Sequence, residues 1–196
     1  MFIIGITGGT GAGKTSALRA LESLGALALD CDRIYHELLA NNAELKSELE
    51  RRFPGVLAKG EIDRQLLGSI VFSDPVALLD LNAITHSFVS EEVSRAIAKW
   101  ESEGGSLAAI DAIALIESGI KGKCDLVVGI TAAEESRISR IMNRDKITRE
   151  RAELRIKAQK PDSYFEENCD YILENTYETA EEFESECKEF FRRFII

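Results

Sequence analysis

The segment Ile4-Gly5-Ile6-Thr7-Gly8-Gly9-Thr10-Gly11-Ala12-Gly13-Lys14-Thr15 decides the fold class of this 196-residue chain. The apolar run Phe2–Ile6 at its start predicts a buried strand. Apolar residues at helical spacing follow the segment as far as Leu24, and Gly25 stands where such a helix would end. The loop between strand and helix matches G-x-x-x-x-G-K-[ST] at every fixed position, in the context that this pattern requires. The sequence therefore predicts a phosphate-binding loop.

Each part of this loop has a chemical role in holding a nucleotide. Glycines let the backbone approach phosphate oxygens, and successive N–H groups with the following helix N-terminus supply positive potential. In this pattern Lys14 reaches the β- and γ-phosphates, and the Thr15 hydroxyl binds Mg²⁺. A glycine-rich turn with a chance Lys-Thr pair is the alternative. The predicted nucleotide-binding residues of the loop are Gly8, Gly9, Thr10, Gly11, Ala12, Gly13, Lys14, Thr15 and Ser16.

Further strand signals alternate with helical stretches along the chain, which predicts an α/β fold with a mainly parallel five-stranded sheet. The other predicted strands are Ala26–Leu29, Leu107–Ile110, Asp125–Ile130 and Tyr171–Leu173. Residues 33–106 form a helical insertion in a single domain, 1–196, although a separately folding subdomain is the alternative. The helices expected in the insertion are Ile34–Leu39, Ala43–Phe53, Arg64–Phe72, Pro75–Ile84 and Phe88–Trp100.

Composition excludes several classes of protein. The chain has 24 Lys and Arg against 34 Asp and Glu, a net charge of −10, which argues against nucleic acid as the main partner. No apolar run approaches the ~18–20 residues of a membrane span, and the N-terminus lacks the basic region of a secretory signal. Four cysteines lie far apart, which favours reduced thiols and a cytoplasmic location: Cys31, Cys124, Cys169 and Cys187.

Carboxylates follow two of the predicted strands. Asp30 and Asp32 stand at the end of the second strand, and on an extended chain they point the same way. One of them can accept the proton of an attacking hydroxyl, and the other can hold Mg²⁺ through water or orient the acceptor. Helix capping is the alternative for both.

Asp111, at the end of the third predicted strand, resembles a Walker-B aspartate that helps to hold the metal, and a strand-end role is its alternative. Glu117 is either a substrate contact or a solvated loop carboxylate.

An arginine face predicts a lid over residues 134–160. Arg137, Arg140 and Arg144 share one side of a helix that Thr131-x-x-Glu134 opens in a capping-box pattern. Guanidinium groups can clamp a transferring phosphoryl group, and Arg140 is the candidate for this catalytic role. A mobile helix–turn–helix that closes over ATP and excludes water fits the region, whereas a solvated face with ion pairs is the alternative. A second capping box, Thr179-x-x-Glu182, opens the last helix.

An ordered series of segments resembles the dephospho-CoA kinase family almost from end to end. Besides the phosphate loop, the resemblance is carried by five further segments, Leu29-Asp30-Cys31-Asp32, Arg64–Phe72, Leu81-Asn82 with His86, Arg140-x-x-x-Arg144-Asp145 with Gln159, and Asp170–Asn175. It implies a P-loop kinase-type three-layer fold with the helical insertion forming the CoA side. The implied reaction is ATP + dephospho-CoA → ADP + CoA, with Mg²⁺ as the metal and the ribose 3′-hydroxyl as the acceptor.

The resemblance also implies roles for individual residues. Asp32 is the expected general base, Arg144 a lid residue on the nucleotide, and Asn175 a residue on the adenine side. The implied substrate-binding set is Asp30, Asp32, His86, Asp111 and Glu117, with Asp30 or Asp111 assisting Thr15 at the metal. A helix-start or packing role is the alternative for His86.

The chain departs from the family pattern at three places. Ile113-Ala114-Leu115 replaces Pro-Leu-Leu, Ser87 replaces the proline after His86 and is positioned to cap a following helix, and acidic residues precede Cys169-Asp170. These departures affect acceptor binding rather than the transfer. Another small P-loop kinase acting on a nucleoside, nucleotide or small alcohol is the first competing hypothesis. A nucleotide-dependent switch is the second, although no N-K-x-D motif is present.

Overall fold

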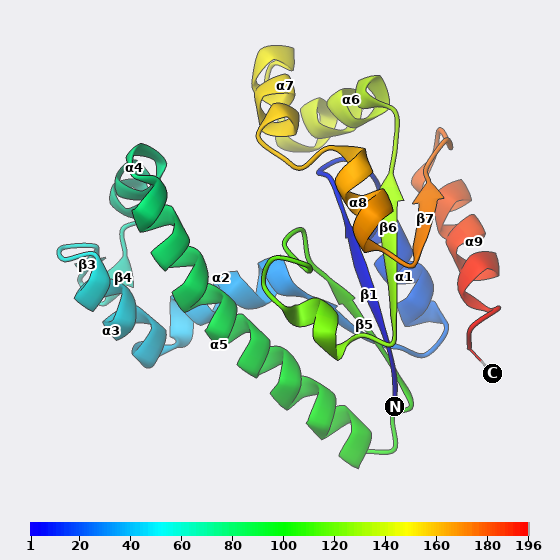
Figure 1. The fold of residues 1–196 in the computed structure, drawn as a ribbon, viewed down its shortest axis with the longest axis horizontal. Coiled ribbons are helices and arrows are strands. Elements are labelled where there is room, and N and C mark those ends of the chain that lie inside the picture. The colour runs from blue at the N-terminus through cyan, green and yellow to red at the C-terminus, as the bar shows by residue number, and fades with distance from the viewer. Residues whose placement is uncertain (196) are drawn as a thin grey trace. The chain divides into compact units, whose positions relative to one another are not determined.

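The computed structural model describes residues 1–195. It divides the chain into two compact units, Met1–Leu29 together with Trp100–Ile196, and Asp30–Lys99. Figure 1 labels the helices and strands of both units. Within the described residues, no helix combines the length and the apolar character needed to cross a bilayer.

A five-stranded sheet forms the centre of the larger unit within residues 1–195. Its strands follow the order β2-β5-β1-β6-β7. Strand β1 pairs in parallel with β5 and β6, and β6 pairs in parallel with β7, which confirms the predicted α/β sheet. The strands are β1 (Phe2–Gly8), β2 (Leu27–Asp30), β5 (Leu107–Asp111), β6 (Leu126–Thr131) and β7 (Tyr171–Glu174).

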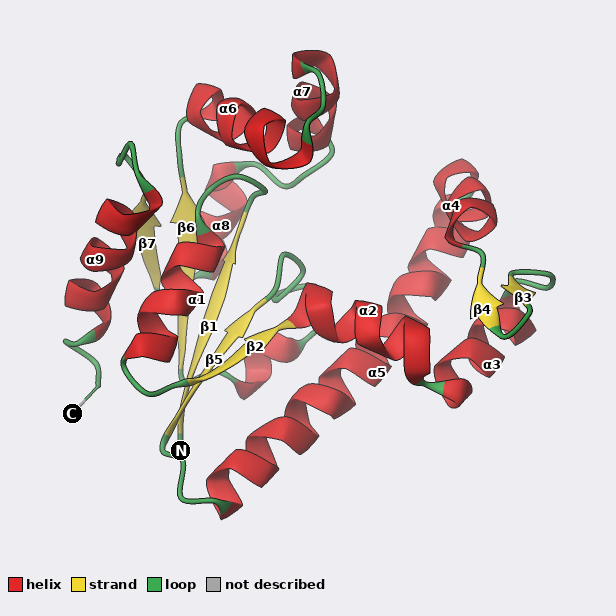
Figure 2. Cartoon of the chain, turned by 180° about the vertical axis from the view of Figure 1, so that it is seen from behind, coloured by secondary structure: helices red, strands yellow, loops and turns green. Residues whose placement is uncertain are grey.

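Helices cover both faces of this sheet and make three layers. On one face, α1 (Lys14–Ser23) and α9 (Ala180–Phe191) lie side by side (Figure 2), and they bury Ile4 and Ile6 of β1 in a common apolar core. On the other face lies α8 (Asp162–Asn168), and a short 3-10 helix, η1 (Ile120–Lys123), follows the loop after β5. Alternate residues of a strand point to opposite faces, so the sheet is apolar on both sides.

The region predicted to be a lid, residues 134–160, contains α6 (Glu134–Asp145) and α7 (Arg149–Lys157), which pack on each other. Ile138, Ile141 and Ala152 form a small separate core between them. The expected capping box at Thr131 is wrong: Thr131 is the last residue of β6, and the residue before α6 is Ala133, whose side chain makes no cap hydrogen bond. Pairing with β7 keeps Thr131 extended, opposite Glu174.

The capping box at Thr179 is confirmed. The Thr179 hydroxyl accepts from the Glu182 N–H at 3.2 Å, and the Glu182 carboxylate accepts from the Thr179 N–H at 3.2 Å. This reciprocal pair satisfies two helix-start donors. The C-terminal helix α9 is thereby fixed at its beginning, and its buried Phe183 and Phe191 complete the core beside α1.

The smaller unit is mainly helical, as expected. It contains α2 (Cys31–Asn41), α3 (Ala43–Arg52), α4 (Arg64–Ser73) and most of α5 (Pro75–Ser102). It also contains a two-stranded hairpin, β3 (Leu57–Ala58) with β4 (Glu61–Ile62), which the sequence pattern did not reveal because each strand has only two residues. Asp63 then caps α4 by accepting from the N–H groups of Gln65 and Leu66 at 3.0 Å.

Two expectations for this unit are wrong. The helices predicted at Pro75–Ile84 and Phe88–Trp100 are one continuous helix, so Ser87 lies in a helix interior and caps nothing. No glycine or proline interrupts residues 84–88, and the Thr85 hydroxyl donates within the helix to the Leu81 carbonyl at 2.8 Å. The chain is also not extended from Asp30 to Asp32, because α2 begins at Cys31.

Candidate active site

The phosphate loop connects β1 to α1 with the backbone geometry that its glycines allow. Gly8, Gly11 and Gly13 have φ of 136°, 80° and 118°, in the range that side-chain-bearing residues rarely adopt. Gly13 is the residue before α1, and its carbonyl accepts from the N–H groups of Ser16 at 3.0 Å and Ala17 at 3.3 Å, so the helix starts directly at the loop. This backbone geometry is the one that the predicted anion site requires, and the anion site itself remains a prediction.

The predicted side chains of the loop lie at the start of α1. The Lys14 ammonium donates to the carbonyls of Gly8 at 3.1 Å and Gly9 at 3.4 Å, so it lies over the loop. Thr15 is exposed, and Ser16 is buried behind it. The Thr15 hydroxyl is therefore accessible to a ligand, whereas the Ser16 side chain belongs to the interior.

Asp111 lies at the carboxyl end of the neighbouring strand. It is the last residue of β5, is 8% exposed, and pairs in register with Ile6, two residues before the loop. The Thr15 hydroxyl and a carboxylate are hard oxygen donors, the type that Mg²⁺ prefers, and Mg²⁺ takes few protein ligands beside water and phosphate. Within residues 1–195, no group of three or more His, Cys, Asp or Glu side chains is placed to hold a metal ion. This donor set fits magnesium bound together with a nucleotide.

Arg140 connects the lid to the phosphate loop. Its guanidinium donates to the carbonyls of Gly11 at 3.2 Å, Ala12 at 3.4 Å and Tyr177 at 2.9 Å, and to the Asn175 side-chain oxygen at 3.2 Å. Partial burial lowers the pKa of Arg140 from its usual value. These acceptors are protein groups on the loop and beside it, so the catalytic role of Arg140 remains a prediction.

Asn175 is brought to the same place by β7. It is 5% exposed, and its amide nitrogen donates to the Ala12 carbonyl at 2.8 Å. Its backbone N–H donates to the Thr131 carbonyl at 2.8 Å, which continues the β6–β7 ladder by one residue. The amide is thus fixed against the phosphate loop from the end of the sheet, and its role on the adenine side of the nucleotide remains a prediction.

Arg144 and Asp145 lie at the far end of α6. Two nitrogens of Arg144 donate to the two carboxylate oxygens of Asp145, at 2.7 Å and 3.0 Å, and Arg155 of α7 binds the same carboxylate. The hydrogen bonds from Arg144, followed by those from Arg155, lower the pKa of Asp145 to about 2. Asp145 thereby links the two lid helices, and Arg144 is more than half exposed at the lid surface.

Two polar residues at the loop were not among the predicted site residues. Arg137 is only 6% exposed and donates from Nε to the Thr10 carbonyl at 3.0 Å. Gln159 accepts from the Thr10 N–H at 2.9 Å. The helical spacing did place Arg137 on the arginine face, and the resemblance included Gln159, but neither pattern reveals contact with the loop.

A cavity of about 410 Å³ opens beside Gly9. Ile113 and Ala114, which depart from the family pattern, line it together with Glu117 and Phe165. Tyr164 forms a hydrogen bond with Glu117, and burial, followed by this acidic neighbour, raises the pKa of the tyrosine. Glu117 is therefore an exposed carboxylate at a cavity that adjoins the phosphate loop.

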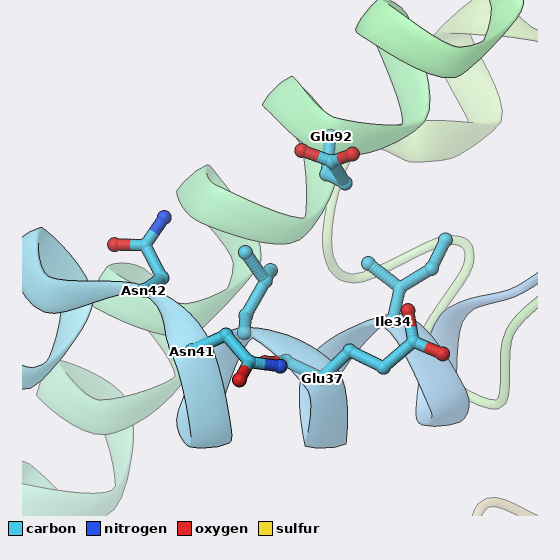
Figure 3. A pocket seen from close by; sticks show the side chains of 6 residues that line it. Ile34, Glu37, Asn41, Asn42 and Glu92 are labelled. Atoms are coloured by element: carbon cyan, nitrogen blue, oxygen red, sulfur yellow. The ribbon is translucent and has the colours of Figure 1, made fainter.

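The remaining predicted residues belong to the smaller unit. The Asp30 carboxylate accepts from the Arg33 N–H at 3.0 Å and caps α2, so its capping interpretation is confirmed. Asp32 is exposed in the first turn of α2, where a negative charge is favourable, and His86 is half-buried in the middle of α5. A separate cavity of about 260 Å³ lies in this unit, with Glu37 and Asn41 of α2 and Glu92 of α5 along it (Figure 3).

Comparison with known proteins decides which phosphate-loop family this is. A family model described as dephospho-CoA kinase matches residues 2–181. The chain belongs to the dephospho-CoA kinase family. A dephospho-CoA kinase of Moorella thermoacetica is 38% identical over 162 residues, which are 81% of this chain and 76% of the relative. The chain is therefore an ATP-dependent kinase for dephospho-CoA.

Solved structures give the same family and fold. Dephospho-CoA kinase from Campylobacter jejuni is similar with a TM-score of 0.67 at 26% identity, covering 98% of this chain and 96% of that one. TT1252 from Thermus thermophilus is similar with a TM-score of 0.82 at 29% identity, covering 100% of this chain and 98% of that one. The predicted P-loop kinase-type fold is confirmed, and the family likeness spans both units of the chain.

Proposed function

We propose that this member of the dephospho-CoA kinase family uses Asp32 as the general base for its transfer. The ribose 3′-hydroxyl of dephospho-CoA attacks the γ-phosphorus of ATP, the bond from that phosphorus to the bridging oxygen breaks, and ADP leaves. The hydroxyl proton passes to the Asp32 carboxylate. The observation that supports this role is the exposure of Asp32 in the first turn of α2, directly after the strand end that Asp30 occupies.

The nucleotide-side residues have roles that follow from their contacts. The loop N–H groups and the start of α1 bind phosphate oxygens, and the Lys14 ammonium, which lies over the loop, shifts to the β- and γ-phosphates. Arg140 holds the Gly11 and Ala12 carbonyls and adds positive charge beneath the phosphates. Arg140 is the proposed catalytic arginine, which neutralises the transferring group when the lid closes, and Arg144 at the lid surface is a proposed nucleotide contact.

Magnesium belongs to this proposal as the metal of the nucleotide. When bound, it neutralises phosphate charge and helps to orient the γ-phosphate. The Thr15 hydroxyl and the Asp111 carboxylate are the groups of this chain that would hold it. The cavity beside Gly9, with Glu117 at it, is the proposed acceptor side of the loop, and the helices of residues 33–106 serve the CoA part of the acceptor.

The test is ADP release from Mg·ATP with and without dephospho-CoA, with the product identified by mass. We expect release that depends on dephospho-CoA and forms CoA. Asp32→Asn should lower kcat ~10²-fold or more, in the range of general bases, while ATP binding stays close to wild type. The matched control is Asp74→Asn, which removes a carboxylate that caps α5 through the Val76 N–H at 2.8 Å.

Two results would contradict the proposal in different ways. Near wild-type turnover of Asp32→Asn would reject Asp32 as the base while leaving the reaction intact. Release that adenosine, AMP or shikimate elicits, but dephospho-CoA does not, would reject the acceptor. The reaction is proposed for the cytoplasm, where the four cysteines, all free thiols in the structure, would remain reduced.

A further inference from the structure

Arg137 and Gln159 meet at one residue of the phosphate loop. Gln159 accepts from the Thr10 N–H at 2.9 Å through its side-chain oxygen, and its amide nitrogen donates to the Thr10 hydroxyl at 2.5 Å. Arg137 donates to the Thr10 carbonyl at 3.0 Å and, from Nη2, to the same Gln159 oxygen at 2.9 Å. The backbone N–H, the carbonyl and the hydroxyl of Thr10 are therefore all bound by this pair.

The packing around Arg137 leaves little freedom for the loop. A Cβ at Gly9 would overlap Arg137 Nη2, and a Cβ at Gly11 would lie 2.8 Å from the Arg137 carbonyl oxygen. The Arg137 side chain thus contacts the loop at Gly9 and Thr10, and its backbone contacts the loop at Gly11. A charged group buried to this degree is stable only when its donors are bound, and Asp162 adds a carboxylate 3.7 Å from Nη1.

These two residues also mark the two ends of the lid. Arg137 lies in the first turn of α6, and Gln159 follows α7 by two residues. Residues 138–158, between them, include the separate lid core and the Asp145 link between α6 and α7. The chain therefore contacts Thr10 both where it enters the lid and where it leaves it. Arg137 and Gln159, which make these contacts, lie 127 and 149 residues from Thr10 in sequence.

We propose that Arg137 and Gln159 are positioning residues that clamp Thr10 and hold the phosphate loop in its nucleotide-binding shape. They act through the loop, not on the substrate. The clamp makes the lid's attachment points part of the nucleotide site, so movement of the lid takes place within residues 142–158, beyond the loop contacts of Arg140 and Ile141, while its base stays fixed on the loop. This inference rests on the proposed function only in taking ATP as the ligand of the loop.

The experiment measures the Kd of Mg·ADP by calorimetry, the KM of ATP, kcat, and the melting temperature. Arg137→Met and Gln159→Leu should each weaken ADP binding and raise the KM of ATP about tenfold, because each leaves loop polar groups unbound. The Kd of Mg·ADP for the double variant should be within about twofold of the Kd of the weaker-binding single variant, because the same clamp is lost in each of these three variants. Gln159→Glu keeps the acceptor for both Thr10 and Arg137, and should bind ADP within about threefold of wild type.

Arg151→Met is the matched control, because Arg151 is an exposed arginine of α7, and it should bind ADP like wild type. A merely structural role predicts lower melting temperatures with unchanged Kd and KM. That result, or fully multiplicative effects in the double variant, would overturn the clamp. ADP binding needs no acceptor: a wild-type protein that binds ADP but does not phosphorylate dephospho-CoA would overturn the proposed function and leave the clamp testable.

Discussion

Gly13 offers the sharpest test of how the phosphate loop is built. Its φ of 118° lies in the left-handed range, which costs a residue with a side chain roughly 1–2 kcal/mol. A Cβ there would also lie 2.5 Å from the Asn175 amide nitrogen and 3.0 Å from the Phe183 ring. Gly13→Ala must therefore displace the Asn175 amide, whose bond to the Ala12 carbonyl is 2.8 Å long. Leaving these buried groups unpaired costs a further ~1–3 kcal/mol.

Two other glycines separate the backbone contribution to the free energy of unfolding from the packing contribution. Gly25 has a φ of 91° with nothing within 4 Å of a Cβ, so Gly25→Ala should cost only the backbone term, about 1–2 kcal/mol. Gly122 also has open space, and no left-handed φ, so Gly122→Ala should be neutral or stabilise by up to ~1 kcal/mol. Gly13→Ala should lower the free energy of unfolding by roughly 3 kcal/mol.

Urea unfolding of the three variants, followed by circular dichroism, measures these free energies. All three positions belong to the larger unit, so they report on the same folded body. We expect the order Gly122→Ala, Gly25→Ala, Gly13→Ala from most to least stable, and weaker ADP binding only in the last. If Gly13→Ala were as stable as Gly25→Ala, the loop would not be packed against Asn175 and Phe183 as the structure shows.

Two further predictions concern titratable groups. Burial, as the largest cause, raises the pKa of Cys124 and Cys187 to about 12 and that of Cys169 to about 11, so these thiols should resist iodoacetamide at pH 8 in the folded protein and react in urea. Mass spectrometry measures this, and equal labelling rates in both conditions would contradict it. Asp145 has a pKa lowered from 3.8 to about 2. The stabilisation from its bonds to Arg144 and Arg155 is therefore complete above pH 3.8 and is lost as the pH falls through 2. The melting-temperature difference between wild type and Asp145→Asn should be constant above about pH 5 and shrink toward pH 2; a constant difference throughout would refute the link.

The strands of the sheet were predictable because each is short, apolar and bounded by turn or helix signals. Capping was less predictable, because the same local pattern occurs in two different contexts. Thr131-x-x-Glu134 and Thr179-x-x-Glu182 are equivalent in sequence, yet only Thr179 caps a helix. Thr131 pairs with Glu174 on β7, and its carbonyl accepts from the Asn175 N–H. Strand pairing over a long sequence separation competes with the local cap, and a local pattern does not report it.

At Asp30 the reverse happened: an extended chain was expected, but a local hydrogen bond starts a helix there. An extended chain would have placed Asp30 and Asp32 on the same side. Instead the Asp30 carboxylate binds the Arg33 N–H and starts α2 at once, so the two carboxylates differ in environment. Asp30 has a backbone partner, whereas Asp32 is exposed in the first turn. This difference gives a physical reason to separate their roles that the sequence spacing did not contain.

For the three arginines of α6, the sequence specifies their place on one helix but not the groups that they bind. Helical spacing correctly places Arg137, Arg140 and Arg144 together on α6, but it treats them as equivalent cations. In the structure their acceptors are different: the Thr10 carbonyl for Arg137, the Gly11 and Ala12 carbonyls for Arg140, and a neighbouring carboxylate for Arg144. The first two arginines thus bind carbonyls of the same phosphate loop, at Thr10, Gly11 and Ala12. Because a peptide N–H and C=O point in opposite directions, holding those carbonyls also fixes the orientation of the loop's peptide planes. Arg144 differs from both, because it is exposed at the lid surface and bound to Asp145.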